Sequence, residues 1–227
     1  MISTFDIRAV VKKMAKYSIR LLIKKKTPYN FIILTSYCRS GSTMLYESLV
    51  KSKYHKSLFS FVIERSIKEH YMHNDNLPFI KRNTIIKTHY SQEKLVIFKG
   101  KYKLINIISK PSDVIKSLYI LHKDKPNIYK RHFKNLGIID ELNFDNIFSR
   151  DILNLEKRME EYKNNKNCLT IKYEYLWDNA DVLSDFVGYK VYLPKKINRR
   201  ASELKDDVPM HLYHNLDKYY DSLEDYF

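Results

Sequence analysis

The sequence predicts an α/β protein of three layers, in which a mostly parallel central sheet lies between helices. Two observations support this prediction. Short apolar runs rich in β-forming residues alternate along the chain with stretches of helical spacing, as in parallel strands joined by crossover helices. Polar residues follow three of these runs, at 37–43, 87–89 and 109–117, and ligands of parallel sheets bind at the carboxyl ends of strands.

The composition is that of one folded domain with an additional N-terminal segment. The chain has 227 residues, 44% of them apolar, which is enough for a globular core. We expect a basic amphipathic helix over residues 1–28 and a single α/β domain over residues 29–227. Two cysteines, Cys38 and Cys168, are too few for a disulfide framework, and residues 1–30 hold no long apolar core. We therefore expect a cytoplasmic protein without a signal peptide or transmembrane span.

The net charge of +15 favours anionic partners such as nucleotides, polyanions or anionic lipid. Part of it reflects a general abundance of lysine, which AT-rich coding produces. Nucleic acid is not an expected partner, because the sequence has no zinc finger, RNA-recognition signature or clear helix-turn-helix. Residues 1–26 place apolar and basic side chains on opposite helical faces. Such a helix either lies on the inner membrane surface as a peripheral anchor or packs on its own domain.

The first strand and helix are predicted by a change of pattern. Residues 31–36 read FIILTS, a short β-rich apolar run that predicts a buried strand. A helix over 42–51 follows, with Leu45, Leu49 and Val50 facing inward. Residues 52–82 are mixed, with helical spacing near 58–70 and a break at Pro78.

Two more strands and a helix come next. Residues 83–90 (NTIIKTHY) and 102–109 (YKLINIIS) are apolar runs that end in polar residues, and both predict strands. A helix over 110–123 is predicted because Pro111 stands in its first turn. Asp113 also lies in that turn, where a carboxylate suits the helix dipole.

The last third of the chain continues the alternation. Residues 124–145 predict a loop-rich region and residues 147–164 a long helix. A fourth strand lies within 167–176, followed by a short helix over 180–187 and a turn at Gly188.

The loop after the first strand has the features of an anion-binding site. Backbone N–H groups at the start of a helix point outward, and the helix dipole favours an anion there. Arg39 adds a fork-shaped cation, while Ser40, Ser42 and Thr43 add hydroxyl donors. This predicts a phosphate-binding strand–loop–helix, similar to a P-loop. The alternative is that Ser40 or Ser42 caps the helix and Arg39 is solvated.

The sequence predicts no metal at this site. The loop has Gly41 as its only glycine and no lysine, so it is not a Walker A motif. The third strand ends in IIS, without an aspartate to hold magnesium. His70 and His73 have the spacing of a helical metal pair, but no third ligand accompanies them.

The stretch YCRSGSTML resembles the 5′-phosphosulfate-binding loop of the sulfotransferases that use 3′-phosphoadenosine 5′-phosphosulfate (PAPS). In that family the loop follows the first strand. It reads lysine or arginine, Ser-Gly, and then two positions of serine or threonine. The arginine form is similar to the carbohydrate and tyrosyl-protein branches. Every position of the motif is matched here, by Arg39, Ser40, Gly41, Ser42 and Thr43.

Three further segments extend the resemblance over about residues 31–190. KPSDVIKSLY resembles the family's 3′-phosphate-binding segment, with Asp113 and Ser117 at the family's spacing. IKTHY resembles the K-T-H segment of the cytosolic branch, which Lys87 and His89 match. LTIKYEYLWDNADVLSDFVGY is similar to the family's late strand, helix and glycine.

The chain departs from the family at three places. Ser109 stands where the family has an arginine, and Lys110 follows it as a substitute cation, a point charge rather than a fork. Met44 stands where an aromatic residue often stacks on adenine. PKKINRR (194–200) is a candidate for the family's late basic stretch, without a residue-by-residue match.

The resemblance implies sulfuryl transfer from PAPS to a hydroxyl or amine of a glycan, lipid or small molecule, without a metal. The spent cofactor would be 3′-phosphoadenosine 5′-phosphate (PAP). His89 would be the catalytic base, and Arg39 with the loop amides and hydroxyls would stabilise the leaving phosphate. Lys87, on the same strand face as His89, would stabilise the transferring group. Lys110 and Ser117 would bind the 3′-phosphate.

Several interpretations stay open on the sequence. His89 can simply end a strand in solvent, Lys87 can be a surface lysine, and Glu64 is a spare candidate base. The tyrosines near the C-terminus can stack on a sugar or pack in the core; they are Tyr213, Tyr219, Tyr220 and Tyr226. A kinase-like P-loop enzyme would turn over ATP with magnesium. A non-catalytic basic module would bind polyanions or a membrane surface with steep salt dependence.

Overall fold

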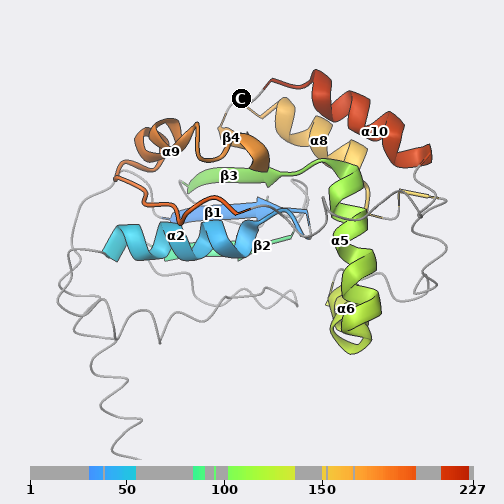
Figure 1. The fold of residues 1–227 in the computed structure, drawn as a ribbon. Coiled ribbons are helices and arrows are strands. Elements are labelled where there is room, and N and C mark those ends of the chain that lie inside the picture. The colour runs from blue at the N-terminus through green and yellow to red at the C-terminus, as the bar shows by residue number, and fades with distance from the viewer. Residues whose placement is uncertain are drawn as a thin grey trace, which may run out of the picture.

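The fold is that of a computed structural model (Figure 1). It describes residues 31–37, 39–54, 84–89, 95, 102–135, 150–151, 153–165, 167–197 and 211–224. The predicted helix over 1–28 lies outside these residues, as do Cys38, Glu64, His70, His73 and Tyr226.

The described chain forms a four-stranded sheet in which all neighbouring strands are parallel. The strand order is β2-β1-β3-β4, so the strand that precedes the predicted anion loop lies inside the sheet. The prediction of an α/β protein with a parallel sheet is confirmed. The strands are β1 (Phe31–Ser36), β2 (Thr84–Thr88), β3 (Tyr102–Ile108) and β4 (Cys168–Lys172).

The register brings the carboxyl ends of the strands to one edge of the sheet. Thr35 of β1 lies opposite Thr88 of β2 on one side and Asn106 of β3 on the other. Asn106 in turn lies opposite Thr170 of β4. The loop after β1, the end of β2 and the start of the helix after β3 therefore share an edge, where ligands of parallel sheets bind.

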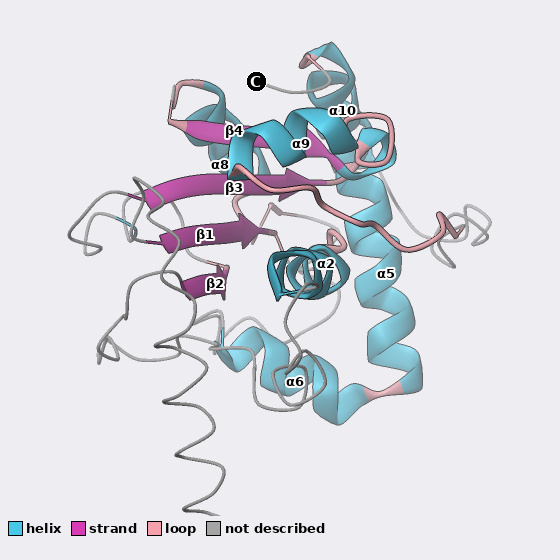
Figure 2. Cartoon of the chain, turned by 90° about the vertical axis from the view of Figure 1, so that its left-hand side faces the viewer, coloured by secondary structure: helices cyan, strands magenta, loops and turns pink. Residues whose placement is uncertain are grey.

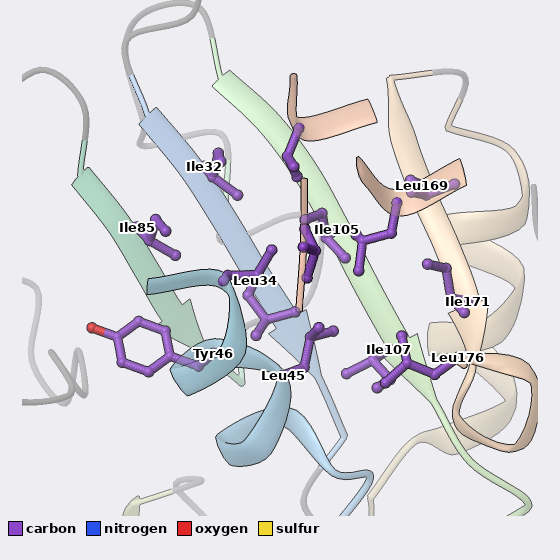
Figure 3. Close-up of a cluster of buried hydrophobic side chains, with 14 of the residues drawn as sticks. Ile32, Leu34, Leu45, Tyr46, Ile85, Ile105, Ile107, Leu169, Ile171 and Leu176 are labelled. Carbon is purple, nitrogen blue, oxygen red and sulfur yellow. The ribbon is translucent and has the colours of Figure 1, made fainter. Parts of the chain in front are cut away.

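One face of the sheet is covered by α2 (Ser42–Tyr54) and α9 (Ala180–Val187). Ile32 and Leu34 of β1 point to this face and pack with Leu45 of α2 and Leu183 of α9. Figure 3 shows this apolar cluster, in which Ile105 and Ile107 of β3 take part. The alternate residues of each strand point to the other face, because side chains alternate along a strand.

That other face is covered by α8 (Leu155–Lys163), whose Tyr162 packs with Ile33 of β1 and Leu104 of β3. The sheet thus lies between two helical layers, as the sequence predicts (Figure 2). A third cluster lies beyond the carboxyl ends of the strands. It joins α8 to α5 (Pro111–Asp124), α6 (Pro126–Asn135) and α10 (His211–Ser222).

Two predictions for the region after α5 are wrong. Residues 126–135, expected to be loop, form α6, because Pro126 suits a first turn and buried Tyr129 and Phe133 are four residues apart. The helix expected over 147–164 begins only at Leu155. Asn154 before it has a left-handed φ of 52°, which ends helical geometry on that side.

The other elements follow the predictions with small shifts. Helix α2 continues to Tyr54, three residues beyond the expected 42–51. The fourth strand ends at Lys172, and a 3₁₀ turn, η1 (Tyr173–Tyr175), follows it. Helix α9 has the expected bounds, and Gly188 ends it with a left-handed φ of 81°.

The C-terminal tyrosines of α10 pack in the core. Tyr213 and Tyr220 are buried in the cluster around α5 and α8, and Tyr219 packs against it. For these three the packing interpretation holds. In the described part of the chain, no helix has both the length and the hydropathy that crossing a membrane requires.

Candidate active site

The loop between β1 and α2 has two residues in left-handed backbone conformations. Arg39 has a φ of 64° and Gly41 a φ of 79°. A non-glycine residue in this region costs on the order of 1 kcal/mol, which the rest of the loop must offset. Left-handed residues beside a helix start form the concave backbone pattern that binds anions.

Ser40 supports the turn of this loop instead of capping the helix. The Ser40 hydroxyl is fully buried and donates to the carbonyl of Tyr37 at 2.8 Å. The first helical bond runs from the Leu45 N–H to the Gly41 carbonyl at 3.1 Å, and Ser42 already belongs to the helix. The capping interpretation is therefore wrong for Ser40, whose hydroxyl holds the anion loop in shape.

Arg39 reaches from the loop to α5. Its Nε donates to Ser117 Oγ at 2.9 Å. The two residues come from the two segments that the sequence assigned to opposite ends of one bisphosphate ligand. The guanidinium has five N–H donors, and this bond uses one of them. Arg39 lies on the exposed surface of the loop, where an incoming anion can meet it.

Lys87 is buried at the end of β2, with 2% of its surface exposed. Its Nζ donates to Thr43 Oγ1, in the first turn of α2, at 2.6 Å. The interpretation of Lys87 as a surface lysine is therefore wrong. A buried ammonium is costly unless it is hydrogen-bonded, and Thr43 accepts one hydrogen bond from it.

His89 follows β2 directly and is half-buried. Its Nδ1 lies 3.1 Å from the Ser36 carbonyl and 3.2 Å from Ser36 Oγ. A carbonyl oxygen only accepts, so the bond to it requires a proton on Nδ1, and in the neutral ring the lone pair then lies on Nε2. The interpretation of His89 as a solvated strand end does not fit this geometry.

Arg158 of α8 belongs to the same edge, although sequence reasoning missed it. Its guanidinium donates from Nη2 to the His89 carbonyl and from Nη1 to the Ser36 carbonyl, the second bond being 3.4 Å long. The spacing of residues on its helix could have indicated it. Arg158 follows Leu155 by three residues and precedes Tyr162 by four, so it lies beside the apolar stripe of its helix.

Lys110 precedes α5 and pairs with Asp221 of α10, 3.1 Å away. Partial burial lowers the pKa of Lys110, but the hydrogen bond and charge of Asp221, with Asp217 and Asp113, outweigh it, so the pKa is raised. Asp217 also accepts from the Ser112 N–H at 2.9 Å. The N-terminus of α5 is thus held by two carboxylates of α10, and the role of Lys110 towards a phosphate stays a prediction.

The other residues that depart from the family's pattern are Met44, Ser109 and the late basic stretch. Met44 is partly buried and packs against the cluster of α2 and α9. Ser109 is fully buried at the end of β3. Of the late basic stretch, Lys196 donates to the Glu174 carbonyl at 2.8 Å and lies over the Trp177 ring. Residues 198–200 lie outside the described chain.

The arrangement can bind an anion and accept a proton side by side. Arg39, the buried Lys87 and the start of α2 offer positive charge, and His89 offers a ring nitrogen with a lone pair. The described residues include no group of three or more histidine, cysteine or carboxylate side chains that could hold a metal ion. The expected independence of metals stays a prediction.

Comparisons with known proteins add three structures. No family model matches the sequence, and no curated protein sequence matches it. The chain is similar to mouse sulfotransferase SULT7A1 complexed with PAP, with a TM-score of 0.43 and 19% identity, over 77% of this chain and 61% of that one. It is similar to retinol dehydratase in a complex with retinol and PAP, with a TM-score of 0.42 and 14% identity, over 84% of this chain and 64% of that one.

The third structure is retinol dehydratase with androsterone and inactive cofactor PAP. Its TM-score is 0.40 and its identity 16%, over 84% of this chain and 64% of that one. The chain thus spans less than two thirds of the length of each of these proteins.

Proposed function

We propose that the chain is a sulfotransferase that moves a sulfuryl group from PAPS to a hydroxyl or amine. One observation carries the proposal. Three segments that resemble sulfotransferase motifs come together at one edge of the sheet through side-chain contacts. Arg39 of the first segment bonds to Ser117 of the third, and Lys87 of the second bonds to Thr43 of the first.

The residues at this edge fit a ligand with two phosphate groups. The left-handed turn at Arg39 and Gly41, before the start of α2, suits the phosphosulfate end. Ser117, a few ångströms from Arg39, suits the 3′-phosphate end. Lys110 suits that end by charge, but it would have to exchange Asp221 for the phosphate. The fit is thus more complete around the first loop than around the N-terminus of α5.

PAPS would supply the sulfuryl group and a phosphate leaving group. The chain's own residues then have separate tasks. Arg39 and the amides at the start of α2 bind and neutralise the leaving phosphate. Lys87, held at Thr43 next to this loop, stabilises negative charge on the oxygen from which the sulfuryl group departs. His89 accepts the acceptor's proton at Nε2 while Nδ1 keeps its proton on the Ser36 carbonyl.

The first test is binding of PAP by calorimetry and thermal shift, with EDTA present. We expect saturable binding of PAP that is at least tenfold tighter than binding of ATP, about 1.4 kcal/mol. Arg39→Ala should abolish it, whereas Arg150→Ala, which removes an exposed arginine elsewhere, should leave it unchanged. Equal affinity for PAP in Arg39→Ala would overturn the site assignment.

The second test is release of PAP from PAPS, with water and then 4-nitrophenol as acceptor. His89→Ala should slow transfer by on the order of 10²-fold or more if His89 is the base. Turnover of ATP with magnesium, without turnover of PAPS, would favour the kinase-like alternative. Salt-dependent binding to heparin without selectivity for PAP would favour the basic binding module.

A further inference from the structure

Helix α8 holds the carboxyl end of β1 through two side chains on neighbouring turns. Tyr162 shares a hydrogen bond with Thr35 Oγ1 at 3.3 Å, between the helix and the strand that it covers. Arg158, four residues earlier, donates to the carbonyl of the next residue, Ser36. The positive charge of Arg158 also acts on the buried Tyr37, whose pKa is raised by its burial and partly lowered by this guanidinium.

The same guanidinium reaches a second strand end. Arg158 Nη2 donates to the His89 carbonyl, so one planar fork joins the residue that ends β1 and the residue that follows β2. Strand ends have backbone carbonyls beyond the last rung of the sheet ladder, and buried carbonyls need a donor. Arg158 supplies donors to two of them at the point where His89 leaves the sheet.

Ser36 links Arg158 to the imidazole ring. Its carbonyl accepts from Arg158 and lies 3.1 Å from His89 Nδ1, while its hydroxyl lies 3.2 Å from the same nitrogen. The backbone of His89 and the partner of its ring are therefore held by one side chain. If Ser36 or the His89 peptide moved, the ring would lose the acceptor that keeps its proton on Nδ1.

We propose that Arg158 is a positioning residue that holds His89 in the tautomer with Nε2 unprotonated. This inference rests on the proposed function of His89 as a base. In the transfer step, the acceptor oxygen forms a bond to sulfur as the bond from sulfur to the phosphate oxygen breaks. The electron pair of that bond leaves with the phosphate, and the acceptor's proton moves to Nε2. With the other tautomer, Nε2 would already carry a proton and could not accept one.

The experiment uses the full chain with ¹⁵N-labelled histidine. The variants are Arg158→Met, which nearly matches the arginine in length without donors, and Arg158→Lys, which keeps one charged donor group. Lys157→Met is the control, because it removes a charge from the adjacent position of α8, where the side chain is 60% exposed. Thermal unfolding identifies any variant that is not folded, and the His89→Ala spectrum assigns the ring signals.

The ring nitrogens report positioning directly. We expect the wild type and Lys157→Met to show a protonated Nδ1 and an unprotonated Nε2 near neutral pH. Arg158→Met should shift both signals towards the average of two tautomers, and Arg158→Lys should fall between. Unchanged signals in a folded Arg158→Met protein would overturn the proposal. This readout needs no activity, so it decides even if PAPS is not a substrate.

Kinetic measurements show whether Arg158 acts by positioning His89 or only by stabilising the fold. With PAPS and 4-nitrophenol, Arg158→Met should lower kcat by about tenfold or more, because it removes part of the rate gain from general base catalysis. The KM for PAPS should change less than threefold. In a His89→Ala background the same substitution should change kcat less than twofold. An equal loss in both backgrounds would overturn the proposal, because a structural role does not depend on the imidazole. Absence of PAP binding by the wild type would instead refute the proposed function.

Discussion

Arg39 Nε donates to Ser117 Oγ at 2.9 Å, across 78 positions of sequence. The bond joins the loop after β1 to the second turn of α5. Both residues belong to segments chosen for phosphate binding on sequence alone, and neither segment shows in its own pattern that the other lies nearby. The contact therefore brings together the segments that open two helices, α2 and α5, whose positions Figure 1 shows.

Removing the Ser117 hydroxyl should weaken PAP binding more than it weakens the fold. Ser117→Ala would remove a proposed donor to the 3′-phosphate and the hydroxyl that accepts from Arg39. We therefore expect PAP binding to weaken by about 1–2 kcal/mol, which raises Kd fivefold to thirtyfold. Stability should change by less than about 0.5 kcal/mol, because the bond is exposed at the surface. Calorimetry and urea unfolding measure the two effects.

The control for this substitution is Ser222→Ala. Ser222 is an exposed serine of α10 that donates to the Tyr219 carbonyl. It should leave PAP affinity unchanged. An unchanged affinity in Ser117→Ala as well would show that α5 does not contact the ligand.

Replacing Lys87 should separate activity from stability. The ammonium is buried at the neutral hydroxyl of Thr43, and methionine has a similar length without a charge to desolvate. We therefore expect Lys87→Met to unfold within about 1 kcal/mol of the wild type. PAP release from PAPS should fall by on the order of 10²-fold, because one donor to the developing charge is lost.

For Lys87→Met, urea unfolding and single-turnover PAP release are measured on the same preparation. A large loss of stability with normal turnover per folded molecule would contradict the role we give Lys87. Lys53→Met, at the other end of α2, is a control for the loss of a lysine near the sheet.

Asp217 should contribute to stability as a cap supplied from another helix. Its buried carboxylate accepts from the Ser112 N–H in the first turn of α5, and Lys110 before this helix has no side-chain cap bond. Asp217→Ala should destabilise the protein by about 0.5–2 kcal/mol, the range for loss of a helix N-cap. Urea unfolding monitored by circular dichroism measures this.

Asp221→Ala is the matched comparison on the same helix. Its ion pair with Lys110 is exposed, with 57% of the Asp221 side chain accessible, so its loss should cost less than about 0.5 kcal/mol. Equal destabilisation by the two substitutions would mean that Asp217 acts by charge alone and not as a cap.

The Cys168 thiol should resist alkylation in the folded protein. Burial raises its pKa from 9.0 to about 12, partly opposed by hydrogen bonds from Thr170 and the Asn106 backbone. Only the thiolate reacts, so iodoacetamide near pH 8 should modify Cys168 slowly until urea unfolds the chain. Mass spectrometry of peptides measures the modified fraction. Equal rates in folded and unfolded protein would contradict the burial.

The same shift predicts how stability depends on alkaline pH. Above pH 9.0 the unfolded chain releases the Cys168 proton while the folded chain keeps it up to about pH 12. The unfolded state then binds fewer protons, so stability should fall through this window, with a Cys168 slope of at most about 1.4 kcal/mol per pH unit. Buried Tyr37 and Tyr162, whose pKa values burial also raises, should add to the fall. Cys168→Ala should show a shallower decline.

Local sequence patterns predict the elements that are determined by short-range chemistry. The strand over 31–36 and the helix over 180–187 have the predicted bounds, because a β-rich apolar run and a terminal glycine mark them. Helix α6 was missed because its composition is largely polar. Among those of its side chains that the structure describes, Tyr129 and Phe133 are buried. The start of α8 was misplaced because Asn154 interrupts a helical pattern without any glycine or proline.

The sequence alone is enough to predict a parallel α/β sheet, and it indicates the loop at 39–43, Lys87 and His89 as candidates for binding an anion and accepting a proton. These follow from residue types that act on their neighbours within a few positions. Only the tertiary structure decides which of them meet. Arg39 bonds to Ser117, Lys87 is buried at Thr43, and Lys110 pairs with Asp221. Arg158 and Asp217 could not be predicted for the same reason. Each binds the backbone of a distant segment, and no local sequence pattern marks such a side chain. Strand order and helix packing determine which segment it meets.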